Sequence, residues 1–298
     1  MMERGRYVSL PSADVHVVDS GGPGAPVVLV HGLGGQHTNW LDVREGLGRF
    51  GRVVSLDLPG FGLSPPLETH GAASFARVVA EMIESLDAGP ALLVGNSMGG
   101  LVSEMAASRS PDLIAHLVLI APAAISFRSR PPSPSLAVQL ALQSFEFPGS
   151  AIVALYRRAS TPEQQALRTL DLVTADRRRI SEEITSASIE MATLRRSMPW
   201  AVRAMVESTA SIRRTLLDRD GYRDLIESIA APTLVLSGAH DRLVTAAAVR
   251  ALTAMRPDWT SVEHPDSGHV PQMEHPAWVI DQMDAWLASA PAARLVAP

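Results

Sequence analysis

Cysteine is absent from this chain. Disulfide bonds, thiolate nucleophiles and thiolate metal sites are therefore excluded. The chain also lacks a strong excess of either charge, since its formal net charge is −5 and its pI is about 6.0. No overall basic field favours binding to nucleic acid, and we expect no nucleic-acid partner.

Long apolar runs are missing as well. The longest ones, near residues 117–125, are far shorter than the roughly 20 residues that a membrane-spanning helix needs. Residues 1–10 carry Glu3, Arg4 and Arg6 and lack the apolar stretch of a signal peptide. We therefore expect a cytoplasmic protein with no stable membrane insertion, and the absence of disulfides is compatible with a reducing cytosol.

What the chain does have is a hydrophobic content of 46% over 298 residues. That is enough for one large core, or for a core with an inserted subdomain. Several short apolar runs show no polar alternation, which is typical of parallel strands covered on both faces. The predicted strands are residues 27–30, 52–56, 91–94, 116–120 and 232–236, with an edge hairpin made of residues 7–10 and 15–18.

Helical patterns separate these runs, and their alternation predicts an α/β fold with a mostly parallel sheet and helices on both sides. The patterns cover residues 74–86, with Ser74 as the expected N-cap, and residues 101–107, 245–255 and 276–288. Between residues 125 and 229 no strand is expected, which indicates a helical insertion. It consists of a linker at 126–134 and helical patterns at 136–147, 151–158, 162–173, 180–194 and 199–217.

A candidate nucleophile lies in residues 92–100, Leu-Leu-Val-Gly-Asn-Ser-Met-Gly-Gly. A buried strand runs directly into Gly-x-Ser-x-Gly and a helix follows at once, which is the context that a nucleophilic serine requires. The sharp turn strains the backbone of Ser97 and leaves its hydroxyl at the carboxyl edge of the sheet, in front of a helix N-terminus that favours negative charge. The alternative is a glycine-rich turn whose serine only caps the helix.

A serine nucleophile needs a base and a group that orients the base. His269 lies in a polar loop between the short run 259–263 and the C-terminal helix, and Asp241 follows the strand at 232–236. The chain order Ser97, Asp241, His269 matches the order of the triad in proteins with this type of nucleophile turn. The alternatives are that Asp241 caps the helix at 245–255 and that His269 is structural.

An oxyanion hole is expected in the glycine-rich turn at residues 30–35. The backbone N–H of Leu33 and that of Met98, directly after the nucleophile, are the candidate donors. An ordinary turn at the end of a strand is the alternative, and His31 is expected to brace the turn rather than react. Gly32, Trp200 in the insertion, and Val270 beside His269 are the candidate substrate contacts.

Two further segments have plainer interpretations. The loop at residues 57–64 is expected to shape the wall of the site near Leu33, because no lysine follows it and its glycine spacing does not fit a phosphate-binding loop. The arginines at residues 177–179 indicate a solvated face, with a patch for an anionic substrate or a membrane as the alternative.

Together these motifs resemble those of the α/β-hydrolase superfamily, and the resemblance covers nearly the whole chain. It implies an α/β-hydrolase fold with a core of residues 1–123 and 231–298 and a helical cap of residues 124–230. It places the catalytic roles on Ser97, Asp241 and His269 and the oxyanion roles on Leu33 and Met98, with no metal or organic cofactor.

Members of this superfamily catalyse several reactions. Ser97 argues against haloalkane dehalogenases and epoxide hydrolases, which use an aspartate nucleophile. The string Gly-Asn-Ser-Met-Gly-Gly is similar to that of the meta-cleavage-product carbon–carbon hydrolases, but those enzymes usually carry tryptophan where this chain has Val270. They also carry a cap arginine, and a rough alignment places Ser188 there.

The expected function is therefore hydrolysis of a carboxylic ester of a small or medium, partly apolar substrate through an acyl-enzyme on Ser97. A carbon–carbon hydrolase, a cofactor-free haloperoxidase-like hydrolase and a non-catalytic ligand receptor remain alternatives. The sequence leaves the oligomeric state open.

Overall fold

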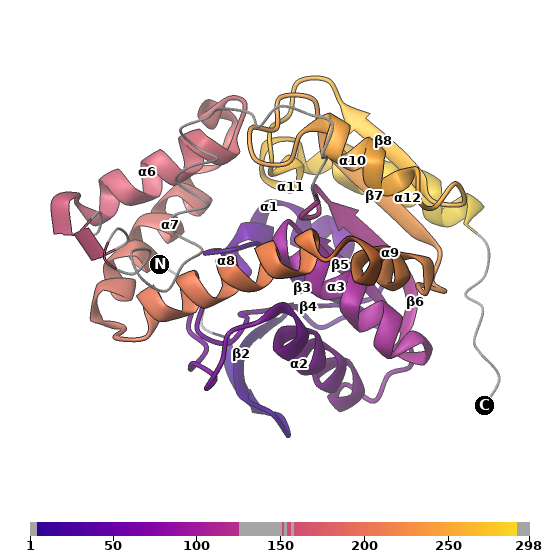
Figure 1. Ribbon diagram of the computed structural model, residues 1–298, viewed down its shortest axis with the longest axis horizontal. Helices are drawn as coiled ribbons and strands as arrows, with labels where there is room; N and C mark the ends of the chain where they lie inside the picture. The colour runs from indigo at the N-terminus through magenta and orange to yellow at the C-terminus, as the bar shows by residue number, and fades with distance from the viewer. Residues whose placement is uncertain (1–4, 125–150, 152–153, 156–157, 291–298) are drawn as a thin grey trace.

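The computed structural model describes residues 5–124, 151, 154–155 and 158–290, and within these residues eight strands form one central sheet (Figure 1). The strands are β1 (Arg6–Ser9), β2 (Asp14–Asp19), β3 (Pro26–Val30), β4 (Arg52–Leu56), β5 (Ala91–Asn96), β6 (Ile114–Ile120), β7 (Thr233–Gly238) and β8 (Thr260–His264). Their order in the sheet is β1-β2-β4-β3-β5-β6-β7-β8. Strands β3 to β8 run parallel, whereas β1 and β2 form an antiparallel hairpin at the edge. The predicted strands, the edge hairpin and the mostly parallel sheet are thus confirmed.

The parallel strands are apolar on both faces because both faces are covered by helices. In β3, Val28 and Val30 pack into one hydrophobic cluster, whereas Val27 and Leu29 pack into the other. Side chains that alternate along a strand point to opposite faces of the sheet, so a strand between two helical layers has no polar side.

Core helices cover the two faces of the sheet. They are α1 (Leu41–Leu47), α2 (Ala72–Ser85), α3 (Met98–Arg109), α10 (Ala246–Thr253), α11 (Pro271–Glu274) and α12 (Pro276–Ser289), with the 3-10 turns η1 (His37–Trp40) and η2 (Pro111–Leu113). Residues of α1 and α12 belong to one cluster, and residues of α2, α3 and α10 belong to the other.

Two details of these helices differ from the sequence prediction. The short helix α1 was not predicted, because its buried face consists of only Val43 and Leu47. The expected N-cap of α2, Ser74, is wrong, since the helix begins at Ala72. The N–H of Ala72 donates instead to the hydroxyl of Ser211, 3.0 Å away on a distant helix, and a cap supplied by tertiary packing leaves no local sequence signal.

In its described residues, the insertion between β6 and β7 consists of helices joined by short turns. It contains α6 (Pro162–Val173), η3 (Arg177–Arg179), α7 (Glu182–Leu194), η4 (Arg195–Ser197), α8 (Ala201–Leu217) and α9 (Arg219–Glu227). The predicted linker at 126–134 and helix at 136–147 lie outside the described residues. Of the helix predicted at 151–158, residues 151, 154, 155 and 158 are described and are helical.

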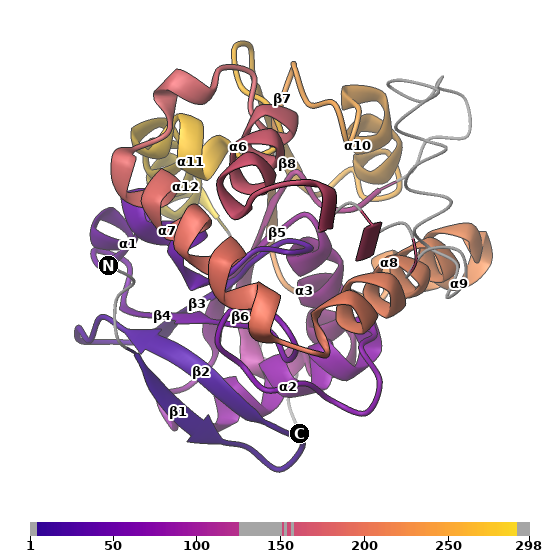
Figure 2. The ribbon, with the colours of Figure 1, turned by 90° about the vertical axis from the view of Figure 1, so that its left-hand side faces the viewer.

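The helices of the insertion differ in how they contact the core. Helices α6 and α7 lie at the left in Figure 1, away from β8 and α12, and with α8 they come to the front in Figure 2. Helix α9 was not predicted and packs on α3, and its Tyr222 and Ile226 join the main hydrophobic core. The boundary between core and cap at residue 230 stays a prediction.

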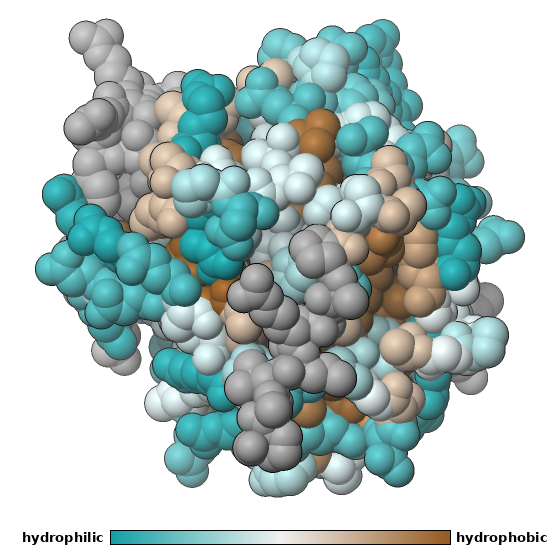
Figure 3. Space-filling view, turned by 90° about the vertical axis from the view of Figure 1, so that its right-hand side faces the viewer, coloured by the Kyte–Doolittle hydropathy of each residue, from teal (hydrophilic) through white to brown (hydrophobic). Residues whose placement is uncertain are grey.

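Apolar surface is largely buried in this arrangement. On the face seen in Figure 3, hydrophilic residues surround smaller hydrophobic patches. Within the described part of the chain, the exposed large hydrophobic residues are Tyr7, Leu155, Leu194 and Leu217. In the same part, every helix is too short or too polar to cross a membrane.

The helix that follows β5 lies unusually close to the sheet. A Cβ atom placed on Gly99 would lie 2.1 Å from the carbonyl oxygen of Val30 and 2.6 Å from that of His31. A Cβ atom on Gly95 would lie 2.3 Å from the carbonyl oxygen of Gly99. Helix α3 can therefore pack against β3 and β5 at this distance only because these glycines have no side chains.

Replacing Gly99 by alanine should separate helix propensity from close packing. Alanine favours a helix by about 0.5–1 kcal/mol over glycine, but overpacking against fixed backbone atoms costs about 1–3 kcal/mol or more. We expect Gly99→Ala to lower the free energy of unfolding, measured by urea denaturation. Gly71→Ala is the control, because its added Cβ would meet only the Ser211 side chain, with the hydroxyl at 3.3 Å, and should change stability by less than about 1 kcal/mol. A Gly99→Ala protein as stable as the wild type would contradict the close approach.

A buried carboxylic acid lies between α3 and α9. Glu104 is fully buried, and one of its oxygens accepts a hydrogen bond of 3.3 Å from the hydroxyl of Tyr222. The other oxygen has no partner among the described residues. Burial raises the pKa of Glu104 to about 8, because a charged carboxylate is poorly solvated in the core. Glu104 is therefore largely protonated at neutral pH.

This acid should make stability fall as the pH rises. Between its ordinary pKa of 4.5 and about 8, the folded state binds more protons than the unfolded state, so the contribution of Glu104 is fully present below the unfolded pKa and is lost toward the folded pKa. We expect the free energy of unfolding of Glu104→Gln, relative to wild type, to increase from pH 5 to pH 8 by up to about 1.4 kcal/mol per pH unit. Urea denaturation across this range measures it. The exposed Glu84 offers a control, and a Glu104→Gln difference as flat with pH as that of Glu84→Gln would refute the expectation.

Candidate active site

Ser97 occupies a strained turn between β5 and α3. Its φ is 56° and its ψ is −117°, a conformation that costs about 1–3 kcal/mol for a residue with a side chain. Ser97 is half-buried, whereas Asn96 and Met98 on either side are buried. Its hydroxyl makes no capping hydrogen bond to α3, so the interpretation of Ser97 as a helix-capping serine is wrong.

Backbone hydrogen bonds hold this turn in place. The N–H of Ser97 donates to the carbonyl of Ile120 at the end of β6, over 3.0 Å. The carbonyl of Ser97 accepts from Leu101 in α3 and from Ala123 after β6. The strained residue is therefore fixed by β6, by the residues that follow β6, and by the first turn of its own helix.

His269 and Asp241 form a buried pair. The Nδ1 atom of His269 lies 2.7 Å from Oδ2 of Asp241, and both residues are less than 10% exposed. The other oxygen, Oδ1, accepts from the backbone N–H groups of Leu243 at 2.7 Å and Val244 at 2.9 Å. Because an ionised carboxylate only accepts, Nδ1 is the protonated nitrogen, which leaves Nε2 as the acceptor.

Asp241 does not cap the helix that follows it. The N-cap of α10 is Thr245, whose hydroxyl accepts from the N–H of Ala248 over 3.2 Å. The alternative interpretation of Asp241 is therefore wrong, and the carboxylate is directed at the imidazole.

The loop of His269 is tied to the nucleophile turn. The side-chain amide of Asn96, directly before Ser97, donates to the carbonyl of His269 at 3.2 Å and to that of Ile120 at 3.0 Å. The N–H of His269 donates to the carbonyl of Val173 at the end of α6, over 2.7 Å. The imidazole is therefore carried by a backbone that is anchored on both sides.

The glycine-rich turn after β3 lies against the same serine. A Cβ atom on Gly32 would lie 3.1 Å from the Cβ of Ser97, and the N–H of Gly35 closes the turn on the carbonyl of Gly32 at 3.0 Å. In the described part of the chain, the N–H groups of Leu33 and Met98 donate to no protein acceptor. Met98 directly follows Ser97 and Leu33 directly follows Gly32, and the role of their N–H groups as an oxyanion hole stays a prediction.

His31 braces this turn. One ring nitrogen, Nδ1, lies 2.7 Å from the carbonyl oxygen of Gly32, and Nε2 accepts from the N–H of Leu58 over 3.0 Å. Burial lowers the pKa of His31 to about 4, so the ring is neutral at pH 7 with its proton on Nδ1. It can therefore connect the turn after β3 to the loop after β4.

The buried carboxylate of Asp57 holds the loop after β4 by hydrogen bonds. It accepts from the N–H groups of His37 at 2.6 Å and Leu63 at 3.0 Å and lies 3.0 Å from Nδ1 of both His16 and His37. Burial opposes its ionisation, but hydrogen bonds from His16 and His37 prevail and hold the pKa of Asp57 below its usual range. Asp57 thus ties the loop at 57–64 to β2 and to η1.

The same three side chains could be considered as metal ligands. The nitrogen and oxygen atoms of His16, His37 and Asp57 lie within 4.8 Å of one another and are buried. Both ring Nδ1 atoms and both carboxylate oxygens already take part in hydrogen bonds. Coordination through either Nδ1 atom would displace the ring proton that bonds Asp57, so these Nδ1 atoms fit a hydrogen-bonded anchor better than a metal centre.

The predicted substrate contacts have unequal support. Gly32 borders Ser97, as described above. Val270 is buried in a cluster with Leu170, Ile180, Ile184 and Met273, which joins the His269 loop to α6 and α7. Trp200 precedes α8 and is half-buried, and its indole N–H is buried without a partner among the described residues. The substrate-binding roles of all three stay predictions.

An arginine that the sequence did not single out reaches the glycine-rich turn after β3. Arg195, in η4 of the insertion, donates to the carbonyl of Gly34 over 2.9 Å. Ser188, the residue aligned with a cap arginine, donates to the carbonyl of Ile184 in its own helix. The double arginine at 195–196 was the available signal, but only the fold of the insertion brings one of them to this turn.

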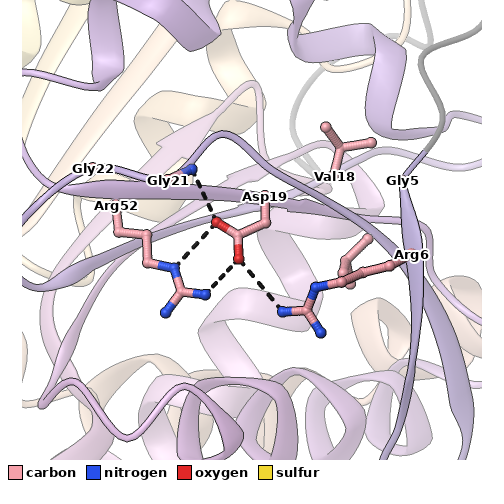
Figure 4. Close-up of a pocket in the computed structure, with 8 residues that line it drawn as sticks. Gly5, Arg6, Val18, Asp19, Gly21, Gly22 and Arg52 are labelled. Atoms are coloured by element: carbon pink, nitrogen blue, oxygen red, sulfur yellow. Dashed lines mark hydrogen bonds and ion pairs between the residues drawn. The ribbon is translucent and has the colours of Figure 1, made fainter.

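A surface pocket lies at the opposite edge of the sheet (Figure 4). It is lined by Gly5, Arg6, Val17, Val18, Asp19, Gly21, Gly22 and Arg52. Arg52 begins β4, whereas Ser97 follows the end of β5, and ligands of open α/β sheets bind beyond the carboxyl ends of the strands. Asp19 also accepts from the guanidinium groups of Arg6 and Arg52, at 3.4 Å and 2.5 Å. This pocket is therefore separate from the candidate active site.

Known proteins share this fold. The chain is 30% identical over 267 residues to the dihydrolipoyllysine-residue acetyltransferase component of an acetoin cleaving system from Pseudomonas putida, covering 89% of this chain and 64% of that protein. It is 26% identical to a 2-hydroxy-6-oxononadienedioate/2-hydroxy-6-oxononatrienedioate hydrolase from a Pseudomonas species, over 89% of this chain and 88% of that protein. A solved esterase from Thermogutta terrifontis superposes with a TM-score of 0.70 at 25% identity, covering 95% of this chain and 98% of that one.

The sequence profile of the Alpha/beta hydrolase family matches residues 27–282. That span runs from β3 to α12 and includes the strained serine, the Asp241–His269 pair and the oxyanion turn. The chain belongs to the α/β hydrolase family.

Proposed function

We propose that this α/β hydrolase is a serine esterase that cleaves carboxylic esters through an acyl-enzyme on Ser97. The observation that carries the proposal is the buried His269–Asp241 pair, whose loop is hydrogen-bonded to Asn96 beside Ser97. The serine hydroxyl is not used to cap its helix. A nucleophile, a base and an orienting acid in this arrangement support acyl transfer.

The proposed reaction has two halves. In the first, Ser97 Oγ attacks the ester carbonyl carbon while Nε2 of His269 takes its proton, and the N–H groups of Leu33 and Met98 stabilise the oxyanion. The bond to the alcohol breaks as His269 returns the proton to the leaving oxygen. In the second, His269 takes a proton from water, the resulting hydroxide attacks the acyl carbon, and Ser97 leaves with the proton. Asp241 stabilises the imidazolium in both halves, and no step uses a cofactor or a metal.

The substrate side of the site favours a partly apolar small molecule. Leu33 and Met205 are partly buried against the main core beside the oxyanion turn, and Met205 lies next to Gly34. Leu63 and Met198 pack with Ala187 and Met191 of α7. We propose that residues 124–230 act as a cap whose helices supply these apolar side chains to a small or medium acyl ester.

Replacing the nucleophile tests the mechanism directly. Ser97→Ala should lower the rate of p-nitrophenyl butyrate hydrolysis by at least about 1000-fold, since a triad nucleophile cannot be bypassed. Ser103→Ala is the matched control, because Ser103 is a buried serine of the same helix. It should keep the rate within a few-fold of wild type. Undiminished turnover by Ser97→Ala would refute the acyl-enzyme, and wild-type protein whose Ser97 resists a fluorophosphonate probe would favour a ligand receptor.

A second candidate function is carbon–carbon hydrolysis of a substrate that carries a carboxylate. The guanidinium of Arg195 lies at the oxyanion turn, where a cation could bind such a group. One relative is named for hydrolysis of a dioate. Against this candidate, Val270 follows the base where enzymes of that type usually carry tryptophan.

The turnover rates of two substrates, together with the KM values of Arg195→Ala, distinguish the two candidate functions. We expect p-nitrophenyl butyrate to be turned over faster than a vinylogous 1,5-diketone with a carboxylate. Arg195→Ala should raise KM for the carboxylate substrate about tenfold or more, because a charge-assisted hydrogen bond contributes about 1.5–3 kcal/mol, and should change KM for the neutral ester less. Arg196→Ala, which removes the adjacent arginine that donates to Ser160, is the control. Faster turnover of the diketone would replace ester hydrolysis as the conclusion.

A further inference from the structure

Glu274 lies five residues after the proposed base and is buried, with 4% of its surface exposed. Its Oε2 accepts from the N–H of Gly268 over 2.6 Å and from the hydroxyl of Ser267 over 3.3 Å. These two residues directly precede His269. One oxygen of Glu274 therefore holds the loop that carries the imidazole.

The other oxygen of the same carboxylate reaches the insertion. Oε1 accepts from the N–H of Ala175 over 2.8 Å and from that of Asp176 over 3.0 Å. These residues form the turn after α6. Glu274 thus joins two chain segments that lie nearly a hundred residues apart in sequence, and each segment occupies one oxygen.

The two joined segments also touch each other directly. The N–H of His269 donates to the carbonyl of Val173, and a Cβ atom on Gly268 would lie 2.6 Å from the backbone nitrogen of Ala175. At such close approach of two backbones, no side chain can separate them. A carboxylate that accepts from both segments fixes their relative position.

Only an acid fits this place. Three backbone N–H groups and one hydroxyl converge on the side chain, and a carboxylate accepts at both oxygens. A glutamine of the same shape has one accepting oxygen and one donating NH₂ group, so either the Gly268 side or the Ala175 side would face a donor. The buried donor left without an acceptor would then move or admit water.

We propose that Glu274 is the positioning residue of the catalytic histidine: its carboxylate sets the placement of His269 through Gly268 and couples it to the turn after α6. This inference rests on the proposed role of His269 as the general base. The inference goes further, because it gives the insertion a second role. Besides covering the substrate, the insertion would support the loop that carries the base. Glu274 itself touches neither the substrate nor the reacting atoms.

The test is the rate at which Ser97 reacts in Glu274→Gln. A displaced imidazole affects the transition state and not substrate binding, so kcat for p-nitrophenyl butyrate should fall about 100-fold while KM stays within about threefold. The rate constant for labelling of Ser97 by a fluorophosphonate probe should fall by a similar factor. Both are measured at a temperature where circular dichroism shows the variant to be folded.

A matched control removes another carboxylate clamp between the insertion and the core. Glu207 in α8 accepts from the backbone N–H of His70 at 2.9 Å and lies 2.7 Å from its Nδ1 atom, far along the chain from His269. Both Glu207→Gln and Glu274→Gln should lower the melting temperature, but Glu207→Gln should leave the labelling rate within about twofold of wild type. Equal losses of labelling in both variants would show a general loss of structure and overturn the proposal.

Two further results would separate failure of the positioning role from failure of the proposed function. A Glu274→Gln protein that labels and turns over like wild type would overturn the positioning role while leaving the esterase proposal intact. Wild-type protein that is not labelled at Ser97 would instead refute the proposed function. If Glu274→Gln does not fold, Gly268→Ala, which forces the same two segments apart, should show the same kcat loss at unchanged KM, and unaltered kcat there would contradict the coupling.

Discussion

The positive φ of Ser97 is the constraint on which the rest of the structure depends. A residue with a side chain adopts this conformation only where its surroundings fix it. Here β5 must end, the chain must reverse, and α3 must begin within one residue, so the helix lies close to the sheet. Gly95 and Gly99 allow that approach, and Gly32 allows the next turn to lie against the serine. In this conformation the hydroxyl makes no capping hydrogen bond to its own helix.

Neutral and anionic groups then stabilise the loops around the serine. His31 is neutral because burial lowers its pKa to about 4, and it connects the oxyanion turn to the loop after β4. Asp57 is ionised and is satisfied by backbone and imidazole donors. The turn that contains Leu33 is thus joined to the loop after β4 by His31, and such support suits the oxyanion role that we propose for the N–H groups of Leu33 and Met98.

The histidine loop depends on contacts from three separate parts of the chain. The carboxylate of Asp241 lies 2.7 Å from Nδ1 of the ring, the side-chain amide of Asn96 donates to the carbonyl of His269, and the carbonyl of Val173 in the insertion accepts from the N–H of His269. The insertion therefore helps to hold the histidine loop. Its last helix, α9, contributes Tyr222 to the main core and to the buried pair with Glu104, so core and insertion share both packing and polar contacts.

The sequence by itself determined the sheet, the alternation of strands and helices, and the position of Ser97, because strand periodicity and the Gly-x-Ser-x-Gly turn are local patterns. It also gave Asp241 and His269 as candidates through their order in the chain. Only the tertiary structure decided which carboxylates hold the site. Glu274 accepts from the N–H of Ala175, 99 residues away along the chain, and Asp57 accepts from that of His37, and backbone donors have no residue-specific signal. The cap of α2 by Ser211 and the approach of Arg195 to Gly34 were hidden for the same reason, since a contact across more than a hundred residues is set by packing and not by spacing.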